Sequence, residues 1–514
     1  MRRKPEPNTP ILVGVGQFTE KDVAPELAMS PMDIAAQAAK SAVIDTGCQQ
    51  LVSQIDTISV TRIFPDSYLN PRVPNPFGRA ENPPRAVARR LGANPERAIY
   101  GTIGGNTPQK TVNEFAERIS RNEIELALLT GSEAINTAQS AIRGGIDLQW
   151  QESDEGSLDD RGMGEAMSTE HERAHGITAP TYAYPLFENA IRGQLGHSIS
   201  EHMLSMGKLF EVFTHVAANN PFSFYGQRRS AQELAEVTAE NRMISFPYPK
   251  WMNSRDSVNQ GAAVIMTSVA KARALDIDPT KWVFLHGCGE ANDKIMVTDR
   301  VNYHSSPALK LNSKKAFQMA GKTIEDMSFM DIYSCFPSAV EVACEALGLQ
   351  FNDNRGLTVT GGLPFFGGPG NNYSMHGIAT MVPLLRKEPD KFGLITANGG
   401  RLTKHATGIY SATPTLGSWQ RENPADYQAE ILREPSPDLA LQPSGWGKIE
   451  TYTVACDRQG PRKGIVVGRL ADGRRFLANT PSDEGFLKRF MAEEQLEKTG
   501  SVSTTNGQNL FTPH

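Results

Sequence analysis

The sequence predicts an α/β protein built from two similar halves, in which helices pack against parallel-rich sheets. Two distant segments share one plan: "SPMDIAAQAAKSAVIDTG" from Ser30 and "SPALKLNSKKAFQMAG" from Ser306 each begin with Ser-Pro, place apolar residues at helical spacing and end in glycine. A strand-like stretch follows each of them, "IDTISV" and "SFMDIY". We therefore expect the same helix–strand pair in both halves.

A second pair of segments supports this duplication. The first half continues with "YGTIGGNTPQ", a helical stretch and the strand-like "IELALLTG". The second half continues with "TGGLPFFGGPGNN", a helical stretch and "KFGLITANGG". Each half thus has a glycine-rich turn that leads into a helix and then into a strand, which is the material of parallel βαβ units.

The predicted boundaries divide the chain into five parts. We expect the first half at 1–132, an insertion at 133–258, the second half at 259–425, a linker at 426–444 and a β-rich domain with a tail at 445–514. Apolar helical spacing in "SISEHMLSMGKLFEVFTHVA" indicates that the insertion is folded and caps a pocket. In the last part, Asp472-Gly473 predicts a hairpin turn, and "EKTGSVSTTNGQNLFTPH" is expected to be a frayed tail.

Composition excludes several classes of function. A formal charge of -5 and a pI near 6.1 give no basic stripe, so no nucleic-acid partner is expected. No apolar run has membrane-spanning length, so no membrane partner is expected either. The five cysteines are scattered and lack CxxC spacing, which argues against a bound metal and against a disulfide framework. These observations favour a cytoplasmic protein.

Several stretches in this order resemble the thiolase superfamily, in particular the sterol-carrier-protein-type thiolases and their thiolase-like relatives. They are "ILVGVGQF", "LLTGSEA", "SVNQGAAVIMTSVAKARAL", "DIYSCFPSAVEVACEALGL" and "GGLPFFGGPGNNYSMHGIATMV". The resemblance implies a thiolase fold of two βαβαβ halves in five layers (α-β-α-β-α), with a loop domain. It also implies a coenzyme A thioester as substrate or ligand, no permanently bound cofactor, and a homodimer or a monomer. The β-rich end resembles an extra barrel-like domain of a thiolase-like subgroup.

The four groups that carry out thiolase chemistry are absent from the matching positions. Gly105 stands at the place of the nucleophilic cysteine, and glycine has no side chain that can attack. Tyr333 stands at the histidine of the HDCF motif. Gly368 stands at the histidine of the GHP turn, with His376 shortly after it, and Asn398 replaces the acid/base cysteine. The resemblance therefore implies a site without covalent acyl transfer.

Other groups remain candidates for the site. Backbone N–H groups at Gly105 and Asn106, at the start of a helix, are suited to binding a carbonyl oxygen. Tyr333 is a candidate hydrogen-bond donor, and Asn398 occupies an acid/base position. His376 is a candidate acid or base, and each of these three side chains is also open to a structural interpretation. His405 follows the strand in "KFGLITANGG" and is a further candidate for the same cavity.

The cysteines and a pair of arginines complete the candidates. Cys335 and Cys288 are alternative nucleophiles for a true acetyl-CoA acetyltransferase, although both are better explained by burial, as is Cys344. Arg228 and Arg229 are the best basic pair for nucleotide phosphates. The leading interpretation is an acyl-CoA-binding, acetyl-CoA acetyltransferase-like protein that acts on C–C bonds by an acyltransferase-related or aldolase-like route. The alternative is a non-catalytic acyl-CoA-binding or complex-forming module.

Overall fold

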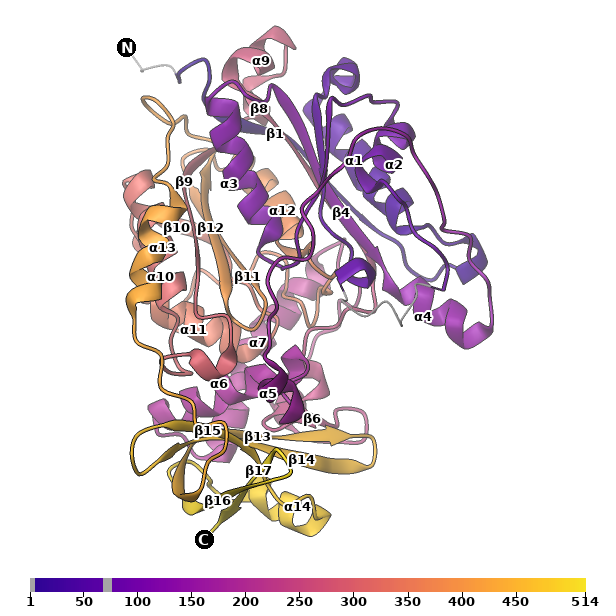
Figure 1. Cartoon of the computed structure of the whole chain (residues 1–514). Coiled ribbons are helices and arrows are strands. Elements are labelled where there is room, and N and C mark those ends of the chain that lie inside the picture. Colours follow the sequence, from indigo (N-terminus) through magenta and orange to yellow (C-terminus); the bar gives the residue numbers. More distant parts are fainter. Residues whose placement is uncertain (1–4, 68–75) are drawn as a thin grey trace.

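The computed structural model describes residues 5–67 and 76–514 and confirms the α/β fold (Figure 1). Within these residues, ten strands form a continuous sheet in the order β10-β11-β12-β9-β1-β8-β4-β2-β3-β5. The strands of the first half are β1 (Pro10–Thr19), β2 (Thr57–Val60), β3 (Arg97–Tyr100), β4 (Leu126–Ala134), β5 (Asp159–Asp160) and β8 (Asn259–Ser268). The strands of the second half are β9 (Val283–Asn292), β10 (Met327–Asp331), β11 (Phe392–Gly399) and β12 (Lys404–Ser411).

The strand order reveals the duplication directly. The series β1-β8-β4-β2 is joined by two antiparallel pairings and then a parallel one, and the series β9-β12-β11-β10 repeats this pattern. The two series meet where β1 pairs with β9, with Ile11 opposite Phe284. The boundaries predicted from the sequence place residues 259–268 in the second half. In the structure they form β8, which lies between β1 and β4 in the sheet of the first half.

The two Ser-Pro segments form matching helices, as predicted. In α1 (Pro31–Thr46) and α10 (Pro307–Ala320) the serine before the proline caps the helix, since its side chain accepts a hydrogen bond from a backbone N–H of the first turn. Both helices end at a glycine with positive φ, +74° at Gly47 and +60° at Gly321. The repeated sequence plan is therefore a repeated local structure.

Helices and sheets alternate in five layers (Figure 1). On one outer side α1 and α2 (Pro83–Leu91) cover the strands of the first half, and on the other α10 and α11 (Pro337–Leu347) cover those of the second. Between the two groups of strands lie α3 (Thr107–Ser120) and α12 (Tyr373–Lys387), which contact each other. Phe115 of α3 and Ile378 of α12 are fully buried in this central layer. The glycine-rich turns that precede α3 and α12 are thereby brought together.

The insertion is folded. Its elements are α4 (Ile135–Gly144), α5 (Glu170–Ala174), α6 (Pro180–Leu195), α7 (Ile199–Asn219), α8 (Ala231–Ala235), β6 (Met243–Ser245) and β7 (Tyr248–Pro249). Its later elements, among them α5, α6 and β6, lie between the layered body and the C-terminal domain, whereas α4 lies at the edge of the first half (Figure 1). The long helix α7 confirms the helix expected from the apolar spacing at 198–217. A short helix, α9 (Val269–Ala274), follows β8.

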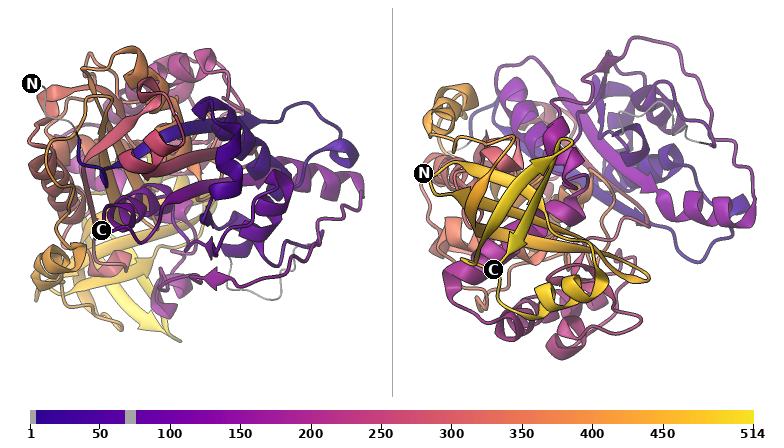
Figure 2. Two further views of the ribbon diagram at one scale, coloured as in Figure 1. Left: turned by 90° about the horizontal axis from the view of Figure 1, so that it is seen from above. Right: turned by 60° about the horizontal axis from the view of Figure 1, so that its bottom comes forward.

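The C-terminal domain is a small barrel (Figure 2). Within the described C-terminal part its strands pair in the ring β14-β15-β17-β16-β13, and pairing of β13 with β14 closes it. The elements are β13 (Gly445–Asp457), β14 (Gly460–Leu470), β15 (Arg475–Asn479), α14 (Glu484–Ala492), β16 (Thr499–Thr505) and β17 (Gln508–Pro513). The hairpin turn predicted at Asp472-Gly473 joins β14 to β15. The expected linker contains a helix, α13 (Pro424–Arg433).

The prediction of a frayed tail is wrong. The tail forms β16 and β17, which are joined by a turn at Asn506 and Gly507 with φ values of +51° and +75°. Phe511 is fully buried in the barrel and Val502 is 2 % exposed. Most polar residues of the tail are exposed, but Asn509 is buried and donates hydrogen bonds to the carbonyl oxygens of Leu441 and Leu477. The Asn-Gly pair is the strongest short-range signal for a hairpin.

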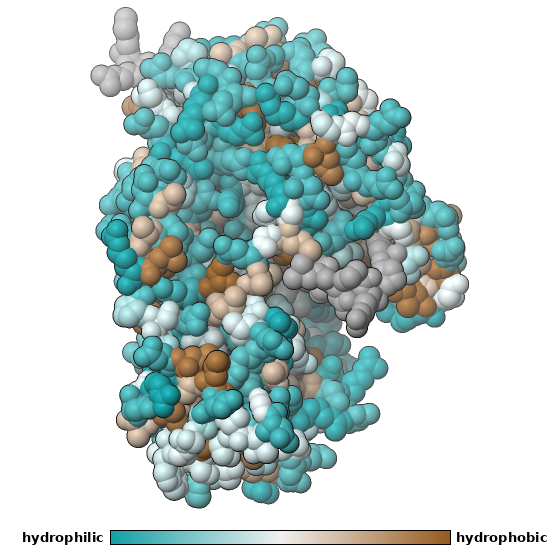
Figure 3. All heavy atoms as spheres, viewed as in Figure 1, coloured by the Kyte–Doolittle hydropathy of each residue, from teal (hydrophilic) through white to brown (hydrophobic). Residues whose placement is uncertain are grey.

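In the described ranges, 5–67 and 76–514, no helix combines the length and the apolarity required to span a bilayer. The face shown in Figure 3 is mostly hydrophilic, and its apolar side chains form small separate groups. One such group lies beside α4, where Ile142 is 61 % exposed.

Candidate functional site

The turn between β3 and α3 is held from the second half. Gly104 donates its N–H to Asn371 Oδ1 over 3.0 Å, and Ser374 Oγ donates to the carbonyl oxygen of Gly105 over 2.8 Å. Asn371 precedes α12 and Ser374 lies in its first turn. The two central helices therefore begin side by side, and the position aligned with the thiolase nucleophile lies at their meeting point.

Gly105 has no space for a side chain. A Cβ built on Gly105 would overlap the hydroxyl oxygen of Tyr333, and the carbonyl oxygen of Asn398 would lie 2.6 Å from it. Tyr333 follows β10, where its N–H donates to Thr396 Oγ1 over 3.0 Å. Its ring lies edge-on to Tyr373, with ring centres 5.4 Å apart. The phenol of Tyr333 thus fills the space that a nucleophilic side chain at Gly105 would need.

The Tyr333 hydroxyl is a neutral hydrogen-bond donor. Burial, reinforced by the nearby Cys335 thiol, raises the pKa of Tyr333 well above its ordinary value of 10.0. Within the described residues this hydroxyl makes no hydrogen bond. The backbone N–H groups of Gly105 and Asn106 likewise donate to no group in the described part of the chain. Three unused donors therefore lie at one turn, which is a suitable arrangement for binding a carbonyl oxygen.

Asn398 joins this turn to the insertion. Its side-chain amide donates to Tyr184 Oη over 2.9 Å and approaches Cys335 Sγ at 3.8 Å, while its Oδ1 is buried without a partner. Tyr184 belongs to α6 and also accepts a hydrogen bond from the N–H of Leu402. Sequence reasoning missed Tyr184, because its stretch "TYAYPLF" carries no motif. A residue of the insertion therefore contacts Asn398.

The cysteines lack the properties of nucleophiles. Burial raises the pKa of both Cys335 and Cys288 to about 12, so both remain protonated thiols at neutral pH. Cys344 is fully buried on α11, as expected for a core residue. These findings argue against acyl transfer through any of the three.

His376 lies deeper in the protein. Its Nδ1 is 2.8 Å from Gln17 Oε1, its Nε2 is buried without a partner, and burial lowers its pKa to about 3. In the described structure no contact joins it to Tyr333. The rings of Tyr373 and Phe366 contact each other, and each contacts one of the two residues. The imidazole is therefore neutral at physiological pH and is separated from the Tyr333 hydroxyl by aromatic rings.

The remaining candidates lie outside the turn. Gly368 donates its N–H to the carbonyl oxygen of Arg255 over 2.8 Å, against the end of the insertion. His405 is buried with its Nε2 3.2 Å from Ser306 Oγ and 3.4 Å from Asp293 Oδ2, at the start of α10. The structure thus brings together Gly105, Asn106, Tyr333 and Asn398, and places Gly368, His376 and His405 elsewhere. The roles of all seven remain predictions.

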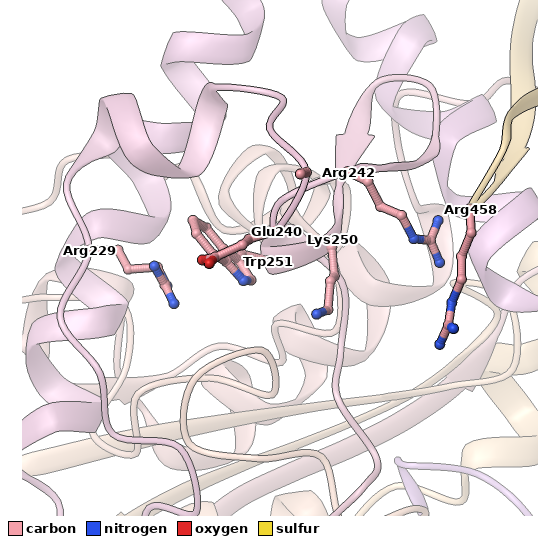
Figure 4. A pocket seen from close by; sticks show the side chains of 7 residues that line it. Arg229, Glu240, Arg242, Lys250, Trp251 and Arg458 are labelled. Atoms are coloured by element: carbon pink, nitrogen blue, oxygen red, sulfur yellow. The ribbon is translucent and has the colours of Figure 1, made fainter.

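A basic cavity lies between the insertion and the barrel. It has a volume of about 550 Å³ and is lined by Arg229, Glu240, Arg242, Lys250, Trp251 and Arg458, together with Ala239. In Figure 4 Lys250 points into the space between Arg229 on one side and Arg242 with Arg458 on the other. Arg229 stacks on Trp251, with its guanidinium carbon 3.3 Å from the ring centre. Of the predicted basic pair, Arg229 lines this cavity and Arg228 does not.

The duplicated five-layer body, with glycine at the nucleophile position, defines a thiolase-like protein. An SCP2-thiolase-like protein type 1 from Mycobacterium smegmatis, described as monomeric, has a crystal structure that is 38% identical, covers 99% of each chain and gives a TM-score of 0.83. Residues 426–507 match the family model of the thiolase-like protein type 1 additional C-terminal domain. The matched range begins with the segment expected to be a linker, 426–444. The chain belongs to the type 1 family of SCP2-thiolase-like proteins.

More distant similarities agree with this family. An acetyl-CoA acetyltransferase from Methanocaldococcus jannaschii is 25% identical over 252 residues, which are 47% of this chain and only 60% of that enzyme. The structures of the Ltp2-ChsH2(DUF35) aldolase and of an acetyl-CoA acetyltransferase from Syntrophomonas wolfei are 19% and 14% identical. Each has a TM-score of 0.55 and covers 79% of this chain, with 98% and 100% of the other chain. They share the fold.

Proposed function

We propose that the protein binds a coenzyme A thioester in its thiolase-type site and holds the thioester carbonyl by hydrogen bonds, without forming an acyl-enzyme. The observation that carries this proposal is the overlap of the Tyr333 hydroxyl with the space beside Gly105. The Tyr333 hydroxyl leaves no room for a nucleophilic side chain at position 105. It is itself a neutral O–H donor in the space that such a side chain would fill.

The carbonyl oxygen would accept hydrogen bonds from the Tyr333 hydroxyl and from the N–H groups of Gly105 and Asn106. Such donors stabilise negative charge that develops on a carbonyl oxygen, and they act most strongly in a buried site. A thioester held in this way is polarised, so negative charge that develops on its oxygen during C–C bond formation or cleavage would be stabilised. Acyltransferase-related and aldolase-like reactions both pass through such an enolate, and the proton that leaves would have to pass to water or to the substrate, because the side chains around Tyr333 supply no base.

The basic cavity is a suitable place for the nucleotide phosphates of the same ligand. Trp251 lines this cavity, and Ser254 donates its N–H to the carbonyl oxygen of Cys335 over 2.9 Å. Ser254 is three positions after Trp251 in the chain, a separation that spans at most about 11 Å. The extended pantetheine arm of coenzyme A can bridge a separation of this order, with its phosphates among the cations and its sulfur toward Tyr333.

The second candidate is a module that binds acyl-CoA without catalysis. It is favoured by the state of His376, because an imidazole with a pKa of about 3 and no contact with Tyr333 offers no proton transfer at neutral pH. The other groups near the Tyr333 hydroxyl are Cys335, which is protonated, and Tyr373, whose pKa burial raises well above 10.0. The same pocket would then hold a thioester without converting it.

Two measurements test these proposals. In calorimetric titrations, Tyr333→Phe should weaken binding of acetyl-CoA by about two- to tenfold, the value of one hydrogen bond, and leave binding of coenzyme A unchanged because that ligand has no carbonyl at this point. Equal losses for both ligands, or none, would refute the carbonyl contact. In D₂O, catalysis predicts deuterium in the methyl group of acetyl-CoA, and a binding module predicts none.

We also propose an oligomeric state and a cellular location for the protein. We expect a monomer, as described for the Mycobacterium smegmatis relative. The five cysteines are unpaired, and this state suits a reducing compartment such as the cytoplasm.

A further inference from the structure

Three ionisable side chains converge in the core between the insertion and the second half. They are Glu188 of α6, His202 of α7 and Glu341 of α11. One ligand atom from each lies within 4.8 Å of the others, and all three side chains are buried. Among residues 5–67 and 76–514 no other group of three His, Cys, Asp or Glu residues meets in this way.

Glu188 is well provided with hydrogen bonds. It lies 2.5 Å from His202 Nε2 and accepts a hydrogen bond of 2.6 Å from the hydroxyl of Tyr248. That hydroxyl also lies 2.7 Å from Ser338 Oγ. Burial favours the neutral form of Glu188, but these hydrogen bonds and the imidazole outweigh it and lower the pKa of the carboxyl.

Glu341 lacks such partners. It is 1 % exposed, and both of its carboxylate oxygens are buried without a hydrogen-bond partner. Burial and the charge of Glu188 raise its pKa well above the ordinary value. Two buried carboxyl groups this close together cannot both carry an uncompensated charge, so a proton or a cation must lie between them.

The imidazole is oriented as a ligand would be. His202 Nδ1 lies 3.3 Å from Nδ1 of His197, so that Nε2 points at the carboxylates. Histidine ligands of metal ions are commonly fixed through their second nitrogen, and carboxylate ligands through hydrogen bonds such as that from Tyr248. The cluster therefore has both the donor atoms and the supporting contacts of a metal centre.

We propose that Glu188, His202 and Glu341 bind one divalent transition-metal ion. Two carboxylates and one imidazole are ligands that suit zinc and manganese, and their two negative charges balance the charge of the ion. Binding displaces the proton on Glu341 to solvent, and His202 binds as a neutral imidazole through Nε2, with its one ring proton on Nδ1 beside His197. Helices α6 and α7 belong to the insertion and α11 to the second half. The ion would therefore cross-link the insertion to the layered body and stabilise their contact.

A shared proton is the competing explanation, and Glu341→Gln separates the two. The amide of glutamine has almost the shape of a protonated carboxyl and donates a hydrogen bond in the same place, but it is a poor metal ligand. If a proton links the carboxylates, this variant keeps the stability of the wild type. If an ion links them, it loses the ion and part of its stability.

The experiment uses the full chain, produced in media supplemented with zinc or with manganese. Elemental analysis is expected to find about one ion per wild-type chain, falling at least about tenfold in Glu341→Gln and in His202→Gln. The melting temperature should fall by several degrees in both variants, and in the wild type refolded with a chelator. Glu133→Gln is the matched control, because Glu133 is equally buried, has a raised pKa and lies outside the cluster.

The proposal is overturned if the wild type from either medium contains only trace metal and refolds to the same melting temperature with zinc, with manganese or with chelator. Since these readings are made on the wild type, they decide the question even if a variant fails to fold. An ion content that is retained in Glu341→Gln and His202→Gln would place the metal elsewhere and would equally refute the assignment.

Discussion

The hydroxyl of Tyr333 occupies the space into which any side chain on Gly105 would project. The two residues are 228 positions apart in the chain and come from the two halves of the duplicated fold. The missing nucleophile and the tyrosine are therefore two parts of one arrangement, in which the bulk of one residue requires the absence of a side chain on the other.

A methyl group at position 105 should therefore destabilise the protein. We expect Gly105→Ala to lower the free energy of unfolding by about 1–3 kcal/mol, the usual cost of overpacking, as measured by urea denaturation. Combined with Tyr333→Ala, the same change should cost clearly less, with a coupling of at least about 0.5 kcal/mol. Gly485→Ala, at an exposed position of α14, serves as control and should leave stability unchanged or raise it by up to about 1 kcal/mol. Additive effects would show that the two residues do not compete for space.

Incubation with acetyl-CoA should leave the mass of the protein unchanged. Cys335 and Cys288 are protonated at neutral pH because burial raises each pKa to about 12. Gly105→Cys alone should also remain unmodified, since Tyr333 blocks the new thiol, whereas Gly105→Cys with Tyr333→Ala should gain an acetyl group. Intact-mass spectrometry measures all three proteins. An adduct on the wild type that vanishes in Cys335→Ala would reinstate acyl transfer.

The repeated helices and strands could be predicted from the sequence because Ser-Pro caps, terminal glycines and apolar spacing are local signals. The relationship between Gly105 and Tyr333 could not, since it depends on how two distant turns meet across the central layer. Glu188, His202 and Glu341 were missed for a similar reason: three separate helices supply them, and no spacing marks them as ligands. The Asn506-Gly507 turn was a local signal that the polar composition of the tail concealed.

Charge reversal in the basic cavity should weaken binding of coenzyme A. We expect Lys250→Glu together with Arg458→Glu to reduce the affinity at least about fivefold, and to make it less sensitive to salt, because exposed ion pairs each contribute up to about 1 kcal/mol. Arg228→Glu is the matched control, since Arg228 is exposed and adjacent to Arg229 yet does not line the cavity. Calorimetry at two salt concentrations measures the effect. If Arg228→Glu lowers the affinity for coenzyme A as much, the effect comes from the net charge of the protein and not from the cavity.

The last strand should contribute strongly to the stability of the barrel. Phe511 is fully buried, so Phe511→Ala should cost about 3–5 kcal/mol of unfolding free energy. Its neighbour Leu510 is 43 % exposed, and Leu510→Ala should change stability by less than about 1 kcal/mol. Thermal or urea unfolding of both variants provides the comparison. Similar small effects at both positions would show that the end of the chain is frayed after all.

The buried imidazole of His376 should make the protein sensitive to acid. Its pKa is about 3 in the folded protein because burial disfavours the charged form, and it returns to about 6.5 on unfolding. Between these two values the unfolded state binds more protons, so the stability that is present above pH 6.5 is lost as the pH falls toward 3.

A single group of this kind contributes up to about 1.4 kcal/mol per pH unit. We therefore expect His376→Gln to unfold at a lower urea concentration than the wild type at pH 7, where it lacks the packed ring, but to lose stability less steeply between pH 6.5 and 4.5. His215→Gln, at an exposed position of α7, should keep the slope of the wild type. Parallel urea denaturations at several pH values measure the slopes. Identical slopes for His376→Gln and the wild type would show that His376 carries its proton in the folded protein, and such a charged imidazole would be available for acid catalysis.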